Sequence, residues 1–268
     1  MKKLIPVLMG VLSAVMAGQE VLILQTLAQS GGLNAGALLK SLSLLLLYLV
    51  PLLLLGVFMM RKEQKFLCYF LLAFLSGGFL IGSLSGLLNY ELTNFLVNLI
   101  PNKAITEHWM PSVVPPVVEE LLKLAVALLV IHAAGFRTLR SWMGIGLAAG
   151  LGFQFLEDYA YILATVIEGG ISPLSQSLLR IESAYATHWL LTALFAGACF
   201  LLIHRKKMWK NPMTYVWLLA PWLLHVSWNS PFIDNNMVLK LTLSVIGWLL
   251  LLGMFLYSRE DSPAPAAG

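Results

Sequence analysis

Charged residues are scarce in this sequence. Asp, Glu, Lys and Arg together make up 11% of its 268 residues, whereas hydrophobic residues make up 59%. A soluble domain carries about 25% charged residues, so the composition excludes an ordinary soluble enzyme and predicts an integral membrane protein. The formal net charge of +4 does not indicate nucleic-acid binding, because the basic residues gather on one side of the predicted membrane spans. No nucleic-acid partner is expected.

Cysteine is also rare. The chain has only Cys68 and Cys199, and both lie inside apolar segments. This excludes a disulfide framework, and the two thiols are interpreted as small buried side chains.

Long apolar runs are what the sequence has in abundance. A spanning helix needs about 20 mostly apolar residues, and eight segments meet this requirement. The first continues to about Leu27, too far for the apolar core of a cleaved signal peptide. The sequence therefore predicts an all-α, polytopic membrane helix bundle, with one transmembrane domain over residues 1–258 and a disordered tail over 259–268. The predicted spans are Leu4–Ala28, Leu38–Met60, Phe66–Leu88, Ser112–Ala134, Trp142–Ile167, Ala184–His204, Met213–Ser230 and Val238–Tyr257.

The basic residues predict the orientation of this bundle. Cytoplasmic loops of membrane proteins carry an excess of Lys and Arg. With the N-terminus inside, twelve of the basic residues lie on the cytoplasmic side and four on the outer side. The outer four are Lys40, Lys103, Arg180 and Lys240. Both termini are therefore predicted to be cytoplasmic.

Two further patterns concern packing and loops. Glycine or alanine recurs every four residues on the third and fifth predicted spans, which favours close helix packing in a bilayer. These residues are Gly78, Gly82 and Gly86, and Gly144, Ala148 and Gly152. The long connection over residues 89–109 has an apolar stripe, and it is predicted to form a short helix on the outer surface.

A few ionisable residues stand inside the apolar spans, where each costs about 2.5–3.5 kcal/mol on insertion scales and marks a functional site by default. They are Glu20, Glu119, Glu120, Lys123, Glu157, Asp158, His188 and His225. At 1.5 Å per residue, Glu119 lies about 10 Å, His188 about 6 Å, His225 about 8 Å and Glu157 about 15 Å below the outer end of its span. Four helices of alternating direction thus place polar groups in the same outer half of the membrane, which predicts one shared site. No role is predicted for Glu20, and no partner for Asp158.

One hypothesis for this site is a metal centre. Two histidines and a carboxylate are a common zinc ligand set that leaves one position for water, and Glu157, His188 and His225 are the predicted ligands. A divalent cation, most plausibly zinc, offsets clustered negative charge that Lys123 alone cannot. Either Glu119 or Glu120 then acts as general base. Asn229, four residues after His225, donates a hydrogen bond to the developing oxyanion.

A metal-free alternative uses the same residues. Here a glutamate paired with His188 activates water directly, and His225 and Asn229 stabilise the oxyanion. Glu, His and Lys within spans also build ion paths in transporters, so a proton- or ion-coupled transporter and a non-catalytic membrane scaffold stay open as rival functions.

Four short motifs resemble a known protease family. They are EELLK (Glu119, Glu120, Lys123), FQFLED (Phe153, Glu157), THWLLT (His188) and HVSWN (His225, Asn229). In this order and on consecutive spans they resemble the PrsW family, within the larger superfamily of CAAX prenyl endopeptidases and bacteriocin-processing enzymes (CPBP). The matching motifs lie between about residues 115 and 229, within a predicted motif-bearing core over 112–230. The resemblance implies an intramembrane protease, of metalloprotease or glutamic type, in which the glutamate pair and the later histidines carry catalysis.

The resemblance also implies a substrate and a location. It suggests a membrane-anchored protein or peptide as substrate, with anti-sigma factors as one such class, and a multi-pass protein in a bacterial cytoplasmic (inner) membrane. One residue departs from the family pattern, in which asparagine usually follows the glutamate of the second motif. This chain has Asp158 there.

Overall fold

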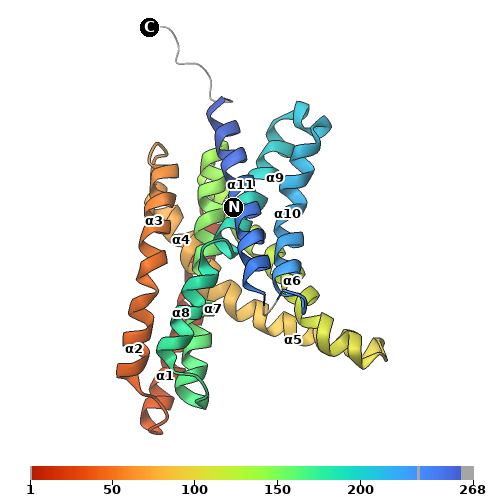
Figure 1. Ribbon diagram of the computed structural model, residues 1–268. Helices are drawn as coiled ribbons and strands as arrows, with labels where there is room; N and C mark the ends of the chain where they lie inside the picture. Colours follow the sequence, from red (N-terminus) through yellow and green to blue (C-terminus); the bar gives the residue numbers. More distant parts are fainter. Residues whose placement is uncertain (1, 234–235, 261–268) are drawn as a thin grey trace.

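Figure 1 shows a computed structural model of the chain, which describes residues 2–233 and 236–260. Within these residues the regular structure is helical and contains no strand, so the all-α prediction is confirmed. The α-helices are α1 (Leu4–Gln29), α2 (Ala35–Leu44), α3 (Leu46–Met60), α4 (Phe66–Leu75), α5 (Gly82–Leu99), α6 (Lys103–Ala134), α7 (Leu139–Glu168), α8 (Pro173–Ala184), α9 (His188–His204), α10 (Pro212–Trp228) and α11 (Met237–Glu260). A π-helix (Ser76–Ile81) joins α4 to α5, and a 3-10 helix (Lys206–Lys210) precedes α10.

Several predicted spans prove to be interrupted helices. The second is a pair, α2 and α3, bent by 46° at Leu45. The third passes from α4 through the π-helix into α5. The sixth is broken at Tyr185–Thr187, so that α9 begins at His188. Hydropathy reports whether a segment is apolar and does not locate a bend or break of its backbone.

Membrane crossing can be judged here by length and composition. Four helical stretches of the described chain are long and apolar enough to span a bilayer, or five if the bent α2–α3 pair counts as one span. The four are Leu4–Gln29, Phe66–Leu99, Pro173–His204 and Met237–Tyr257. α6 and α7 carry the polar residues described below, and α10 has only 17 residues. The count of eight spans and the cytoplasmic termini stay predictions.

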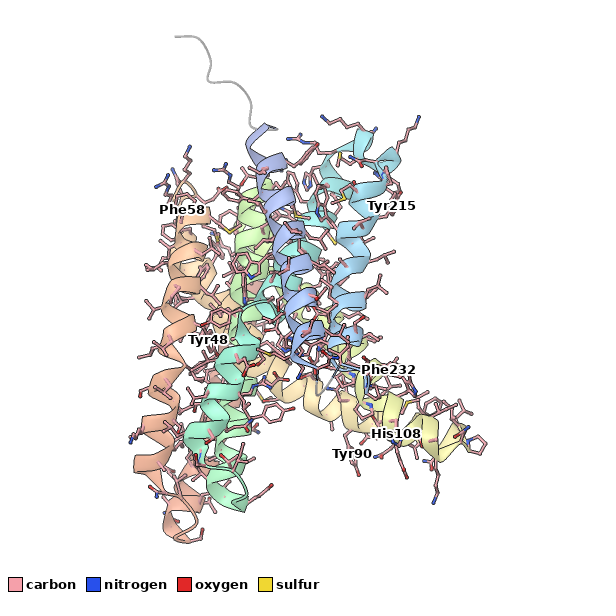
Figure 2. All side chains as sticks on the ribbon, in the orientation of Figure 1. Tyr48, Phe58, Tyr90, His108, Tyr215 and Phe232 are labelled. Atoms are coloured by element: carbon pink, nitrogen blue, oxygen red, sulfur yellow. The ribbon has the colours of Figure 1, made fainter. Side chains whose placement is uncertain are left out.

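The connection between α5 and α6 differs from its prediction. It contains no separate surface helix, because α5 continues to Leu99 and α6 begins at Lys103. Figure 1 shows the end of α5 and the start of α6 diverging from the bundle, and Figure 2 places Tyr90 and His108 on this diverging part. Arg259 and Glu260, which were predicted to lie in a disordered tail, belong to α11; the rest of that predicted tail, residues 261–268, lies outside the described part.

Helix α9 is packed at the centre against α7, and glycine makes this possible. A Cβ added at Gly150 of α7 would lie 2.3 Å from the carbonyl oxygen of His188, and one added at Gly152 would lie 1.9 Å from that of Phe74. Only glycine permits backbones to approach this closely. The packing role predicted for Gly152 is confirmed, and Gly150 fixes the level at which α9 begins.

Candidate functional site

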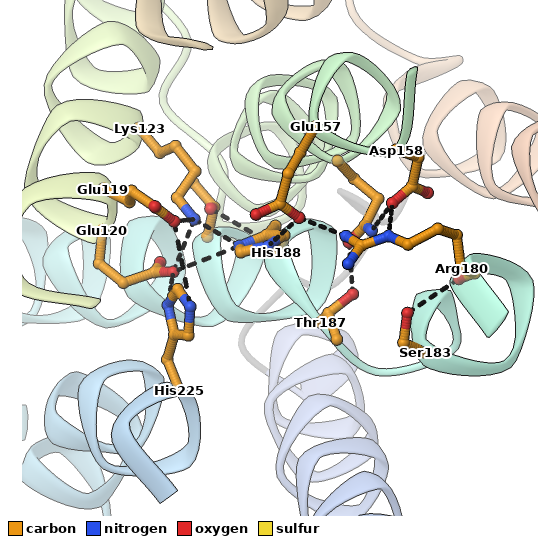
Figure 3. Close-up of polar contacts among 12 residues, drawn as sticks. Glu119, Glu120, Lys123, Glu157, Asp158, Arg180, Ser183, Thr187, His188 and His225 are labelled. Carbon is orange, nitrogen blue, oxygen red and sulfur yellow. Dashed lines mark hydrogen bonds and ion pairs between the residues drawn. The ribbon is translucent and has the colours of Figure 1, made fainter. Parts of the chain in front are cut away.

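The polar residues of four predicted motifs meet in one place, shown in Figure 3. Three of them come from α6, two from α7, one from the first turn of α9 and one from near the end of α10. They are Glu119, Glu120, Lys123, Glu157, Asp158, His188 and His225. Glu120 and Lys123 are fully buried, and Glu119 is 5% exposed. The sequence argument for a single shared site therefore agrees with the structure.

Lys123 lies at the centre of the group. Its ammonium donates to Glu120 Oε1 (2.7 Å), lies 2.7 Å from His188 Nδ1, and lies 3.9 Å from Glu119 Oε2. It also sits over the ring of Phe153, 4.4 Å from the centroid, a favourable cation–π contact. An ammonium group has three donors and no acceptor, so His188 Nδ1 accepts from it and the neutral ring of His188 carries its proton on Nε2.

Glu120 also orients His225. Its Nδ1 lies 2.9 Å from Glu120 Oε1, the oxygen that also accepts from Lys123. The ionised carboxylate accepts hydrogen bonds only, so Nδ1 of His225 carries the proton and Nε2 is left available. The two imidazole rings lie edge to face, 4.9 Å apart at their centroids. Both rings thus have one nitrogen fixed by a charged neighbour.

Glu119 differs from Glu120 in its surroundings. Asn89 of α5 donates from Nδ2 to Glu119 Oε1 (3.2 Å). Like Oε2 of Glu120, Glu119 Oε2 is buried without a hydrogen-bond partner. That oxygen lies 4.0 Å from His225 Nε2. Because an unpaired buried carboxylate oxygen is energetically costly, it is a natural place for a water molecule, a proton or a substrate group.

Arg180 of α8 was missed by the sequence analysis, which placed it only among the outer basic residues. Its guanidinium donates through Nη2 to Glu157 Oε2 and through Nε to Asp158 Oδ1. Glu157 Oε2 in turn lies 3.3 Å from Nε2 of His188, the nitrogen that carries the proton. Arg180 therefore reaches His188 through one intervening carboxylate. The sequence could not show that Arg180 lies beside Glu157, because it does not reveal the break before α9 that lets α8 pack against α7.

Asp158 is the centre of a second, fully buried network. Tyr48 donates its hydroxyl to Asp158 Oδ2 (2.7 Å), and Gln154 donates from Nε2 to Asp158 Oδ1 (3.0 Å). Thr187, the residue before α9, donates to Gln154 Oε1. Together with Arg180, these contacts satisfy Asp158 completely and tie the N-terminal end of α9 to α7.

A cavity of about 860 Å³ opens beside the group. Its lining includes five of the six predicted site residues: Glu119, Glu157, His188, His225 and Asn229. Glu120, the sixth, is not part of the lining. Asn229 is the C-cap residue that follows α10, and its backbone carbonyl accepts a hydrogen bond from Ser112 of α6 (2.6 Å). Pro111 and Pro115 of α6 also line the cavity, and α6 stays helical through its prolines.

The sequence matches the PrsW family of intramembrane metalloproteases over residues 67–257. This match covers well over half of the chain and includes every motif of the site. The chain belongs to the PrsW family. No curated protein and no solved structure matches the chain.

PrsW membership makes this chain a multi-pass integral membrane protein and supports proteolysis within the membrane as its activity. It also explains why ionisable residues on α6, α7, α9 and α10 converge, since a hydrolase needs acid, base and hydrogen-bonding groups at one point. The matched range extends beyond the predicted motif-bearing core on both sides, and it includes Asn89, which contacts Glu119.

The metalloprotease label requires a test against the side chains present. Glu119, His188 and His225 bring one ligand atom each to within 4.8 Å of one another, close enough to hold a metal ion. The sequence predicted Glu157 as the carboxylate ligand, whereas the structure brings Glu119 close to the two histidines. The surroundings fit poorly, however, because the Lys123 ammonium already lies among these groups and His188 accepts from it. A divalent cation at His188 Nε2 requires His188 to move its proton to Nδ1, which faces a donor.

The charge balance also differs from the prediction. The sequence favoured a metal because Lys123 alone could not offset the negative charge of Glu119, Glu120, Glu157 and Asp158. Arg180 now pairs with two of them, Glu157 and Asp158. Lys123 pairs with Glu120. Lys123 also lies 3.9 Å from Glu119 Oε2, so each of the four carboxylates has a cation within 4 Å. The electrostatic need for a divalent ion is therefore much smaller than the sequence suggested.

Proposed function

We propose that this protein is an endopeptidase that hydrolyses peptide bonds of membrane-anchored proteins or peptides at the Glu119–His188–His225 group, in the outer half of the bilayer. The observation that carries the proposal is Glu119 Oε2, which is buried, has no hydrogen-bond partner and belongs to a residue that lines the cavity. Substrates of the anti-sigma-factor type, which are anchored in the membrane, are the proposed class for this site.

Glu119 acts as the proton acceptor in this proposal. A general base must lie within hydrogen-bond reach of the water that it activates, and Glu119 is the member of the glutamate pair that lines the cavity. Glu120 is enclosed, with one oxygen shared between Lys123 and His225. This separates two roles that the sequence left open: Glu119 transfers protons, and Glu120 positions His225.

The remaining residues bind and orient the peptide. His225 presents Nε2 on the same side as Glu119 Oε2. Asn229 lies one helical turn further along α10 and lines the cavity, so its amide is available to the developing oxyanion. Glu119 takes a proton from water, the resulting hydroxide adds to the carbonyl carbon, and the same carboxyl returns the proton to the amine as the C–N bond breaks.

No step of this mechanism passes through a metal, because Lys123 stands among the ligand atoms. The deciding experiment is metal analysis of the purified protein together with a peptidase assay before and after chelation. We expect cleavage to continue after complete metal removal. Loss of activity on chelation that zinc restores would mean that Lys123 leaves His188, and it would reinstate the metalloprotease mechanism.

The activity itself is tested with an anchored substrate peptide in liposomes. The wild-type protein should cleave it, and Glu119→Gln should not. The matched control is Glu182→Gln, which removes an exposed carboxylate on α8 that does not line the cavity. Ion flux through the same liposomes without proteolysis would instead support the transporter alternative, and equal cleavage by Glu119→Gln would remove Glu119 from the mechanism.

A further inference from the structure

Glu20 is an ionisable residue of the apolar spans to which the mechanism gives no part. It lies on α1, outside the four motifs, and it lines the same cavity as Glu119. Its neighbours Gln19 and Val21 are exposed, as expected for a helix that faces lipid. A carboxylate in such a helix is costly, so its place at the cavity wall calls for a functional explanation.

Glu20 has no cation beside it. Each of Glu120, Glu157 and Asp158 has an ion pair with Lys123 or Arg180, whereas no ion pair to Glu20 is found in the part of the chain that the structure describes. Arg180 is the only Lys or Arg in the lining, and it is held by two carboxylates. The cavity therefore presents an uncompensated negative charge at its α1 wall.

A second polar group faces the same region. The Tyr159 hydroxyl of α7 lies near enough to Glu20 to interact with its charge and within reach of a hydrogen bond to it, but no group of the described chain meets the distance and angle of a formed hydrogen bond to this buried hydroxyl. Tyr159 is 9% exposed and lines the cavity. A buried hydroxyl with no partner costs free energy, so this group and Glu20 together are prepared for a ligand that donates hydrogen bonds.

Part of the cavity lining is apolar or small. Ile23 and Leu163 line the cavity with Glu20 and Tyr159. A Cβ added at Gly86 of α5 would meet no atom within 4 Å, so the space beside α5 is open. The long hydrocarbon stem of a basic side chain suits such walls, because Lys and Arg pack their stems on apolar surface while the charged head seeks polar groups.

We propose that Glu20 and Tyr159 form a subsite for the ammonium or guanidinium group of a Lys or Arg side chain of the substrate. This inference rests on the proposed function, since the ligand is part of the peptide that is cleaved. Outer loops near membrane spans are poor in Lys and Arg, so a basic residue close to the scissile bond separates substrates from most other membrane proteins.

The test compares anchored peptides that differ only by Lys, Gln or Glu at one position, scanned across the cleavage site. At the position that reaches the subsite, the wild-type protein should show about tenfold higher kcat/KM for Lys than for Gln, a typical effect of one charge-assisted hydrogen bond. Glu20→Gln should abolish this preference, and Glu20→Lys should reverse it in favour of Glu. Tyr159→Phe should weaken it. Glu182→Gln should leave it unchanged.

Binding separates this inference from the proposed function. In the Glu119→Gln protein, the Lys peptide should bind more tightly than the Gln peptide, and adding Glu20→Gln should remove the difference. Selective binding without any wild-type cleavage would support the subsite and overturn the peptidase. Cleavage by the wild-type protein with no preference for Lys at any position, or a preference that Glu20→Gln keeps, would overturn the subsite.

Discussion

The ammonium of Lys123 lies 2.7 Å from Nδ1 of His188, although the two residues come from different helices and lie 65 positions apart. This contact fixes the imidazole of His188 and occupies the nitrogen that a metal or a proton would otherwise use. The same ammonium holds Glu120, so one buried cation organises residues of the first and third motifs.

Replacing Lys123 by Met should inactivate and destabilise the protein. Removing one partner of a buried ion pair leaves the other charge uncompensated and costs about 3–5 kcal/mol, and here Glu120 is the charge left behind. The double variant Lys123→Met/Glu120→Gln should recover much of the thermal stability without recovering activity. Thermal unfolding in detergent and the peptidase assay check both parts. Equal stability of the single and double variants would contradict the pairing.

The two adjacent glutamates should respond differently to substitution. Glu119→Gln should lower kcat by about 10²–10⁴, the usual contribution of general acid–base catalysis, with little change in stability, because its Oε2 makes no hydrogen bond. Glu120→Gln should instead lower both activity and stability, since it breaks the contacts to Lys123 and His225. Steady-state kinetics and unfolding of both variants measure this contrast. If Glu120→Gln proved as stable as wild type, its positioning role would be wrong.

Arg180 should behave as a positioning residue. Arg180→Gln keeps one amide donor for Asp158 but removes the charge that holds Glu157. We expect kcat to fall about 10- to 100-fold, as for other groups that orient a reacting residue, with KM little changed. Arg180→Lys should restore only part of this loss, because one ammonium cannot reproduce the two directed bonds of a guanidinium.

The control for Arg180 is Glu182→Gln on the same helix, which should retain wild-type kinetics. A fall in stability with unchanged kcat in Arg180→Gln would show that Arg180 merely fastens α8 to the bundle. A rise in KM with unchanged kcat would point to substrate binding at Arg180 instead.

Gly150 should be intolerant of any side chain. A Cβ there would lie 2.3 Å from the backbone carbonyl oxygen of His188, so Gly150→Ala must push α9 away from α7 and displace His188. Overpacking of this kind costs about 1–3 kcal/mol. Gly10→Ala on α1 is the matched control, because no atom lies within 4 Å of its added Cβ. Differential scanning calorimetry of both variants measures their unfolding temperatures, and we expect a lower one for Gly150→Ala. Equal unfolding temperatures would contradict the close packing.

The sequence predicted the composition of the site well because burying a charge in an apolar span is costly. Glu119, His188 and His225 stand out against hydrocarbon, and their predicted depths agree across three helices. The residues that complete the site were hidden for the opposite reason. Asn89 and Arg180 lie near the ends of predicted spans, and Tyr48 carries only an ordinary polar hydroxyl within one. Only the tertiary packing shows the partners of these three residues.

Helix boundaries were less predictable than helix identity. Hydropathy reports where a segment is apolar, but the bend at Leu45 and the break at Tyr185–Thr187 depend on local backbone contacts. That break mattered most for function. It makes His188 the first residue of α9, and it brings Arg180 on α8 beside Glu157 on α7.

A single atom, Glu120 Oε1, accepts from both Lys123 and His225. The first and fourth motifs therefore share one hydrogen-bond acceptor, so a substitution at this contact in one motif affects the other. In any relative that has lost the lysine, we expect the paired glutamate and the histidine near the end of α10 to have changed as well, so these three positions should be inherited as a unit.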